Sequence, residues 1–272
     1  MLNLKGKLAR SVNTWLSIES LQPLYDRLNT LSLLGMNVGS ATNYLENNGE
    51  LHVMKFVKKN CDGRNVAPVI FDVGAHTGGY ARELNLVFGK NARLFCFEPS
   101  KNLFAELNEN TRGYSDSVES YNLGLGDAKS SVTLYDSGNH IPTTLSDAFS
   151  ILDEKVASTE TIEIVRLDEF CAERNIEKID FLKVDVEGNE LKVLQGAGEM
   201  INRAQIDFIQ FEFGQHCVAS KSFFYDFYSL LKHNYELFRV LPNALYKIEK
   251  YQTKLEIFVS ATNYLAVKKS LS

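Results

Sequence analysis

Short apolar runs alternate along this chain with stretches in which apolar residues recur at helical spacing, and this alternation constrains the fold more than any other feature. Val69–Val73 is the first such run, and Ile179–Val184 and Ile206–Phe213 are strongly apolar later ones. Tyr80 and Leu84 belong to the helical pattern that follows the first run. Strands that are buried on both faces have continuous apolar runs of this kind. The pattern predicts an α/β fold with a mainly parallel sheet that helices cover on both faces.

The 272 residues divide at about residue 66. Residues 1–66 are expected to form a helical extension with a lead-in loop, and residues 67–272 the α/β domain. Apolar residues recur at helical spacing near the start, at Leu4, Leu8, Val12 and Trp15. This spacing predicts an amphipathic helix. That helix either folds onto its own domain or docks on a membrane surface or a partner, and it could equally mediate a homo-oligomer.

The charge and the cysteines exclude several classes of protein. The formal net charge is −5, whereas a general nucleic-acid binder is normally basic, so no nucleic-acid partner is expected. The four cysteines form no C-x-x-C pair, which argues against a zinc knuckle and favours a reduced, cytoplasmic compartment. No run reaches the roughly 18 apolar residues of a membrane span, and the start lacks the continuous apolar stretch of a signal peptide. We therefore expect a cytoplasmic protein without a transmembrane segment.

The residues just after each predicted strand are the candidate functional residues, because ligands bind beyond the carboxyl ends of parallel strands. These positions are 72–79, Glu98, 126–127, 185–188 and 212–216, and all five groups carry a carboxylate.

A glycine-rich turn, Asp72-Val73-Gly74-Ala75-His76-Thr77-Gly78-Gly79, follows the first strand. Glycines let the backbone turn tightly and approach a ligand, and the next helix presents free N–H groups there. The dinucleotide pattern G-x-G-x-x-G is incomplete because His76 replaces its second glycine, and the P-loop pattern is absent. S-adenosylmethionine carries an ammonium, a sulfonium and a ribose but no phosphate, so it suits an acid at Asp72. Glu98 follows the second strand, where an acid accepts hydrogen bonds from ribose hydroxyls.

These residues resemble those of a known family. The segment 71–78 is similar to motif I of class I S-adenosylmethionine-dependent methyltransferases, and later segments resemble the FkbM family in particular. They are Phe97-Glu98-Pro99, residues 122–127, residues 167–170, residues 180–190 and residues 263–266. The most specific is Lys183-Val184-Asp185-Val186-Glu187-Gly188, and the resemblance spans roughly residues 66–267. It implies a Rossmann-like class I methyltransferase sheet of about seven strands, with the last strands antiparallel.

The resemblance also implies roles for individual residues. It places Asp72, Gly74 and Gly78 at the methionine end of the cofactor, Glu98 on the ribose and Asp127 near the adenine. The residues expected around the cofactor are Asp72, Gly74, Ala75, His76, Gly78, Glu98, Pro99, Gly126, Asp127 and Asp185. The stretch 35–50 resembles the lead-in of sugar-modifying members and is expected to cover the cofactor.

Methyl transfer to an aliphatic hydroxyl requires alignment and a base that takes the proton. The candidates are Asp185, Glu187, Glu212, His216 and His140. The carboxylates Asp185, Glu187 and Glu212 could converge into a site for Mg or Ca, or could hold a base at raised pKa by mutual repulsion. Alternatively, Asp185 only shapes the cofactor pocket. His216 is a candidate base near neutral pH, and the loop around His140 could border the acceptor site.

The sequence thus predicts an S-adenosylmethionine-dependent O-methyltransferase, with Mg as an additional cofactor to be tested. The acceptor is expected to be a hydroxyl on a sugar, glycan or related small molecule, and the sugar preference comes from the resemblance alone. Two alternatives stay open: a nicotinamide-dependent oxidoreductase, and a non-catalytic Rossmann-like scaffold.

Overall fold

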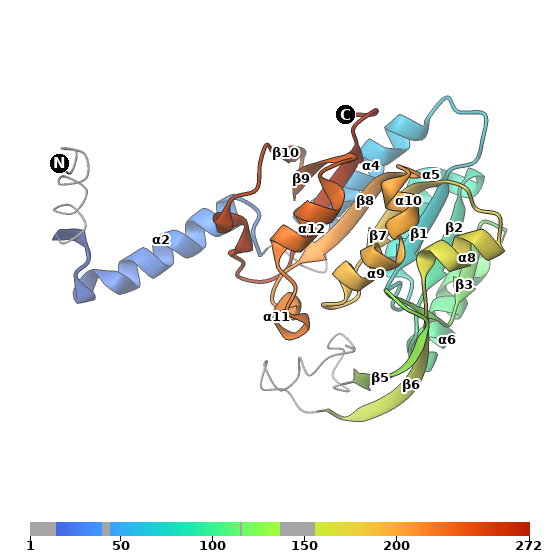
Figure 1. The fold of residues 1–272 in the computed structure, drawn as a ribbon, viewed down its shortest axis with the longest axis horizontal. Coiled ribbons are helices and arrows are strands. Elements are labelled where there is room, and N and C mark those ends of the chain that lie inside the picture. Colours follow the sequence, from blue (N-terminus) through green and yellow to red (C-terminus); the bar gives the residue numbers. More distant parts are fainter. Residues whose placement is uncertain (1–14, 40–43, 115, 137–155) are drawn as a thin grey trace.

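The computed structural model describes residues 15–39, 44–114, 116–136 and 156–272. Its main feature is an eight-stranded sheet with the order β10-β9-β11-β8-β7-β1-β2-β3 (Figure 1). These strands are β1 (Val69–Val73), β2 (Arg93–Phe97), β3 (Val118–Tyr121), β7 (Ile179–Val184), β8 (Ile206–Phe213), β9 (Tyr235–Leu241), β10 (Ala244–Ile248) and β11 (Thr262–Lys268).

The sheet has the predicted mixture of strand directions. Strands β3, β2, β1, β7 and β8 are parallel to one another, whereas β11, β9 and β10 pair antiparallel. The predictions of a mainly parallel sheet and antiparallel last strands are confirmed. The sheet has eight strands rather than about seven because β10 folds back on β9 as an edge hairpin.

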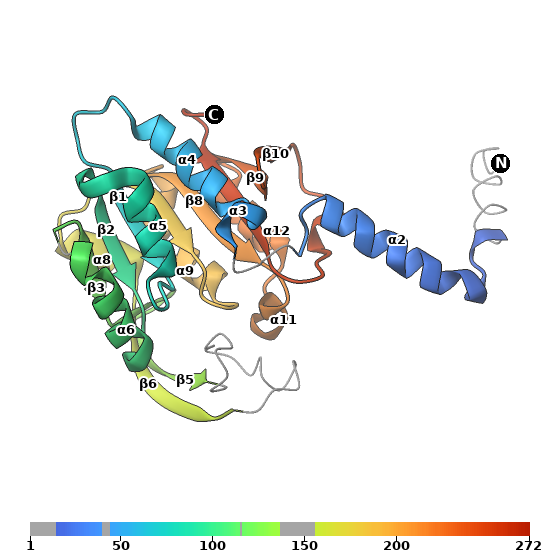
Figure 2. The ribbon, with the colours of Figure 1, turned by 180° about the vertical axis from the view of Figure 1, so that it is seen from behind.

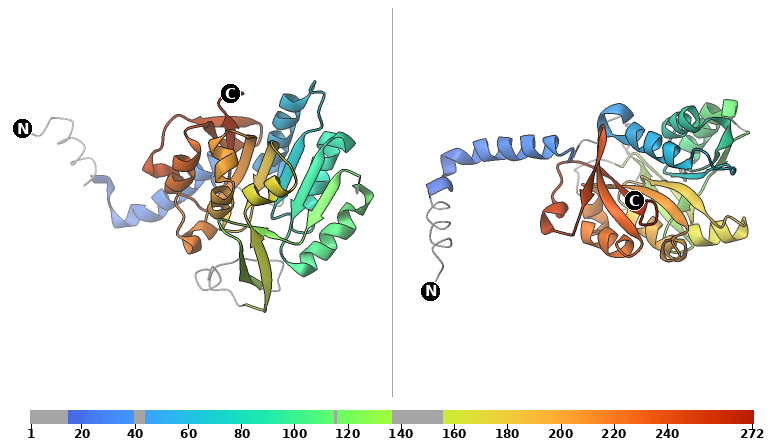
Figure 3. Two further views of the ribbon diagram at one scale, coloured as in Figure 1. Left: turned by 45° about the vertical axis from the view of Figure 1, so that its right-hand side comes forward. Right: turned by 90° about the horizontal axis from the view of Figure 1, so that it is seen from above.

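Helices cover both faces of the sheet (Figures 2 and 3). One face carries α4 (Glu50–Cys61), α5 (Gly79–Phe88) and α6 (Lys101–Thr111), and the other carries α8 (Leu167–Glu173), α9 (Glu190–Gly196), α10 (Gly198–Asn202) and α12 (Phe224–Leu231). Each face has its own buried apolar cluster. Helix α4 buries Val53, Met54 and Val57 completely against the first face, so this part of residues 1–66 packs into the α/β domain.

A second, three-stranded sheet lies at the carboxyl end of the main one. Its order is β4-β6-β5, from β4 (Gly124–Leu125), β6 (Ser158–Val165) and β5 (Ser130–Asp136). The apolar residues that recur from Val118 to Leu125 predict one continuous strand, but the chain leaves the main sheet at Asn122. The Asn122 amide donates hydrogen bonds to the carbonyls of Glu98 and Pro99, which fixes this departure.

Helix α2 (Gln22–Gly35) extends away from the body of the protein in every view (Figures 1 and 3). It ends at Gly35, the first residue of the glycine-containing stretch 35–40, which predicts a break in the helical pattern. A buried Asn37 ties the following turn to the carbonyls of Asn48 and Val240. The amphipathic helix predicted from Leu4 to Trp15 lies outside the described residues except for Trp15, which is 78% exposed. No helix in the described ranges is long and apolar enough to cross a membrane.

Candidate active site

The glycine turn after β1 adopts a conformation that only glycine can provide at its first position. Gly74 has a φ of +84°, and a Cβ there would lie 1.7 Å from the backbone oxygen of Asp185. The N–H groups of Gly74 and Ala75 both donate to the carbonyl of Phe97 at the end of β2. Gly78, with a φ of +87°, precedes the first residue of α5. The turn after β1 therefore contacts the end of β2 and the residue that follows β7 directly.

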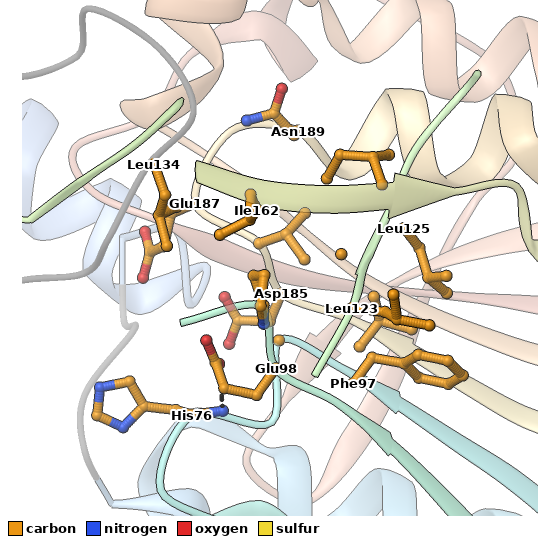
Figure 4. Close-up of a pocket in the computed structure, with 16 residues that line it drawn as sticks. His76, Phe97, Glu98, Leu123, Leu125, Leu134, Ile162, Asp185, Glu187 and Asn189 are labelled. Carbon is orange, nitrogen blue, oxygen red and sulfur yellow. Dashed lines mark hydrogen bonds between the residues drawn. The ribbon is translucent and has the colours of Figure 1, made fainter. Parts of the chain in front are cut away.

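A cavity of about 270 Å³ opens above these strand ends (Figure 4). One wall is apolar and comes from β2, the 122–125 segment and the small sheet: Phe97, Leu123, Leu125, Leu134, Ile162 and Ile164. The opposite wall carries Gly74, His76 and three carboxylates, Glu98, Asp185 and Glu187. Pro99 and Asn189 also line the cavity. An apolar slot beside convergent polar groups is the usual composition of a small-molecule site.

Glu98 is held rigidly at this cavity. Its Oε2 accepts a hydrogen bond of 2.9 Å from the N–H of His76, and its Oε1 accepts one of 2.9 Å from the N–H of Ser100. Burial raises the pKa of the Glu98 carboxyl to about 7, and the two backbone hydrogen bonds oppose this rise. Each oxygen retains an unused lone pair, so the carboxyl can also accept hydroxyl donors from a ligand.

Asp72 does not line the cavity. It points to the α4–α5 face of the sheet, is fully buried, and has no hydrogen-bond partner for either oxygen among the described residues. The ammonium of Lys183 lies 3.8 Å from its Oδ1. Burial raises the pKa of the Asp72 carboxyl to about 6, against the attraction of Lys183. A role for Asp72 at the methionine end of the cofactor stays a prediction.

Lys183 lies behind the cavity and contacts Asp185, and it is not among the site residues predicted from the sequence. Its buried ammonium lies 3.1 Å from Asp185 Oδ2 and 4.3 Å from the ring centre of Tyr80. The nearby acids Asp185, Asp72 and Glu50 raise the pKa of this lysine despite its burial. The only signal in the sequence is the alternation of β7, which places residue 183 on the same face as residue 185.

Glu50 belongs to the same buried network. Its carboxylate accepts hydrogen bonds from the side-chain amides of Asn48 and Gln210, at 2.8 and 3.0 Å. Gln210 also receives a hydrogen bond from the Tyr80 hydroxyl and donates one to Asn263. The sequence could not identify this network because its members, from Asn48 to Asn263, are up to 215 positions apart.

Asp185 and Glu187 are two positions apart after a predicted strand, so in an extended chain they would point the same way. Both line the cavity, but by a different route. The chain does not stay extended: β7 ends at Val184, and Glu187 has a φ of +54°. The buried carboxylate of Glu190 accepts hydrogen bonds from the N–H groups of Val186 and Gly188, which folds this loop back on itself.

Glu187 pairs with His216, the first residue of α11 (His216–Ser220), at 3.1 Å between Oε2 and Nδ1. Burial, Asp185 and Glu190 together raise the pKa of Glu187 well above its ordinary value. Glu212 is the penultimate residue of β8, one step beyond the register partner of Val184, and its pKa is raised by burial and by Asp185 and Glu187. The structure therefore gathers four of the five candidates for acid–base chemistry at one sheet edge.

The remaining predicted residues lie elsewhere. Ala75 is buried beneath the glycine turn, Gly126 packs against Ile164, and Asp127 is exposed outside the cavity lining. His140 lies outside the described residues. In the described part of the chain, no group of three or more His, Cys, Asp or Glu side chains is arranged to hold a metal ion, so the predicted magnesium site at Asp185, Glu187 and Glu212 gains no support.

Comparison with known proteins places this site in a class. Residues 72–237 match the methyltransferase FkbM domain, which covers more than half of the chain. The chain belongs to the FkbM methyltransferase family.

Two relatives carry more specific descriptions. The 2-O-methyltransferase NoeI of Sinorhizobium fredii is 28% identical over 155 residues, which are 53% of this chain and 63% of that protein. The hexuronic acid methyltransferase AglP of Haloferax volcanii is 27% identical over 148 residues, or 54% of this chain and 56% of that protein. The chain thus aligns with less than two thirds of either relative. Among solved structures, the human methyltransferase 10 domain containing protein has a TM-score of 0.42 at 10% identity, with 84% of each chain covered.

Proposed function

We propose that this chain is an S-adenosylmethionine-dependent methyltransferase that O-methylates a hydroxyl of a sugar, a glycan or a related small molecule. One observation carries the proposal: the anchored Glu98 carboxyl shares a single cavity with the Gly74 turn, an apolar slot, and the carboxylates of Asp185 and Glu187. These are the complementary groups for a ribose, a planar base and a cationic sulfur centre. When bound, S-adenosylmethionine supplies the methyl group.

Residues at different positions along the cavity are assigned to different parts of the cofactor (Figure 4). Glu98 accepts hydrogen bonds from the ribose hydroxyls, and the apolar wall around Phe97 and Leu125 holds the adenine. Asp185, held by Lys183, lies at the glycine turn, where its charge favours a sulfonium and an ammonium. A cofactor held at these groups would be fixed in one place, and alignment of the reacting atoms can supply several kcal/mol, up to roughly 7–11 in ideal systems.

We assign the proton-accepting role to Glu187. Its carboxyl reaches the cavity, and its raised pKa makes it a better base than an ordinary glutamate. The imidazole of His216 contacts the same carboxyl and can stabilise the charge that changes there. The proposed reaction uses alignment and a base, and Mg is retained only as a variable in the assay.

The nature of the acceptor follows from the relatives. One is described as a 2-O-methyltransferase and the other as acting on hexuronic acid, which favours a sugar or glycan acceptor.

Family membership disfavours the nicotinamide oxidoreductase. The non-catalytic scaffold is disfavoured too, because a pocket without a ligand has no need for an anchored Glu98. All four cysteines are buried free thiols, which supports a cytoplasmic location.

Calorimetric titration with S-adenosylmethionine and S-adenosylhomocysteine tests the cofactor. We expect micromolar binding that Glu98→Gln weakens at least tenfold, about 1.4 kcal/mol. Glu119→Gln is the matched control, because Glu119 is exposed on the neighbouring strand β3 and outside the cavity. Binding of NAD without either sulfur compound would overturn the proposal, as would equal affinity of the two variants.

Radiolabelled methyl transfer to a panel of methyl glycosides and methyl glucuronides tests the acceptor. The assay is run with Mg²⁺ and with EDTA. Incorporation into at least one glycoside is expected in both conditions. Incorporation into an amine or thiol panel but into no glycoside would contradict the proposed acceptor class.

A further inference from the structure

A second cavity, of about 300 Å³, lies between the C-terminal end of α2, the β9–β10 hairpin and the short helix η4 (Thr253–Glu256). It shares no lining residue with the first cavity. Strand β9 is four strands from β1 in the sheet, which corresponds to about 19 Å at the usual strand spacing. A small ligand in this cavity would therefore not touch the cofactor site.

The second cavity is positively charged although the chain as a whole is acidic. Four basic side chains line it against one carboxylate, whereas the formal net charge of the protein is −5. The basic residues are Arg239, Lys247, Lys250 and Lys254, and the acid is Glu249. Only Lys247 has an ion-pair partner among the described residues, Glu236 at 2.7 Å. A site with this excess of positive charge favours an anionic ligand.

Arg239 is the residue in this cavity that most strongly indicates an anionic ligand. It lies on β9, is half-buried, and its Nε is completely buried without a hydrogen-bond acceptor in the part of the chain that the structure describes. Its guanidinium contacts the ring of Tyr246, 5.1 Å from the ring centre, and pairs with no carboxylate of the described residues. Of the arginines in the described ranges, only Arg27 also lacks an ion pair, and Arg27 is exposed on α2. A half-buried guanidinium with free donors matches a carboxylate or phosphate group.

The remaining lining and the volume of this cavity indicate a ligand larger than an inorganic anion. Apolar side chains from α2, the following turn and η4 form much of its wall, among them Leu33, Val38, Leu255 and Ile257. Its volume is about ten times the share of one water molecule in the liquid. We propose that this cavity binds an organic oxyanion: a phosphate or carboxylate held by Arg239, attached to an apolar chain or ring that packs against Leu33 and Leu255. This site is independent of the proposed methyl transfer.

Calorimetric titration of the full chain with phenyl phosphate, octyl phosphate, inorganic phosphate and octanol tests the proposal. Arg239→Gln removes the anchor, and Arg27→Gln removes the same charge outside the cavity. Thermal unfolding of each variant checks the fold without reference to the cofactor. The double variant Lys250→Gln/Lys254→Gln provides a second test on exposed residues, should Arg239→Gln fail to fold.

Phenyl or octyl phosphate is expected to bind at least tenfold more tightly than inorganic phosphate or octanol. Arg239→Gln should weaken that binding at least tenfold, the lysine double variant about threefold, and Arg27→Gln not at all. A preference for the octyl compound would indicate a lipid chain, and a preference for the phenyl compound a soluble aromatic ligand. Equal binding of inorganic phosphate, unchanged binding by Arg239→Gln, or no binding of either organic phosphate would overturn the proposal.

Discussion

The buried carboxyl of Asp72 makes the stability of this protein depend on pH in a way that one substitution can isolate. Burial raises its folded-state pKa from 3.8 to about 6, against the attraction of the Lys183 ammonium 3.8 Å away, and among the described residues neither oxygen has a hydrogen-bond donor. A carboxyl whose pKa is higher in the folded state binds its proton more tightly there. The wild type therefore loses stability as pH rises from about 4 to about 6, and the full loss persists above that range.

Asp72→Asn removes this titration. The rise in pKa corresponds to about 3 kcal/mol when the pH spans both values, and to between about 2 and 3 kcal/mol from pH 4 to pH 8. The unfolding free energy of Asp72→Asn, relative to wild type, should increase by that amount across the range. Other titrating groups, such as Glu98, are common to both proteins and largely cancel in the difference.

Urea denaturation at pH 4, 5, 6, 7 and 8, followed by far-ultraviolet circular dichroism, measures this difference. The single tryptophan, Trp15, is unsuitable as a probe because it is exposed and lies before α2. Asp116→Asn is the control, since Asp116 is exposed in a loop. A difference between Asp72→Asn and wild type that stays constant to within about 0.5 kcal/mol would refute the reasoning.

Three further predictions concern the turn and loop that form the cavity. Gly74→Ala should cost more than about 3 kcal/mol in urea denaturation, because its Cβ meets a backbone oxygen, whereas Gly63→Ala, with φ +80° and open space, should cost about 1 to 2 kcal/mol. Glu187→Gln should lower kcat about 100-fold or more. Between pH 5 and 9, the wild-type rate should fall on the acidic side, at a pH above the ordinary glutamate value of 4.5, as Glu187 becomes protonated, and the variant should lack this fall. A pH profile that the substitution leaves unchanged would exclude Glu187 as the base. Glu190→Ala should cost about 2–3 kcal/mol and accelerate hydrogen exchange of the amides at 186 and 188, and protected amides would contradict its role.

The strands of this fold could be predicted because their signals are local. Buried runs such as Val69–Val73 and Ile179–Val184 are continuous in the sequence, and their order in the chain predicts helical crossovers between them. The predicted end of β3 was wrong because apolar residues recur as far as Leu125, beyond Asn122, where the chain changes sheets. The hydrogen bonds that cause the change, from Asn122 to the carbonyls of Glu98 and Pro99, join segments that local patterns do not connect.

The candidate site was predictable where a residue follows a strand directly. Glu98 and Asp185 reach the cavity for that reason, whereas Glu187 reaches it through the folded loop after β7. The buried network of Lys183 and Glu50 was not predictable, since an isolated lysine within a strand or a glutamate at a helix start has many ordinary explanations. Only the fold brings the two into one electrostatic unit.

The small sheet contributes part of the apolar wall of the cavity, and three of its residues pack apart from the main body. Leu134, Ile162 and Ile164 form an apolar cluster of their own, apart from the two clusters that hold the large sheet to its helices. Substitutions at these three residues therefore alter the shape offered to a ligand while leaving the two larger clusters in place. Sequence changes on β5 and β6 can therefore alter which ligand the chain prefers without lowering the thermodynamic stability of the α/β domain.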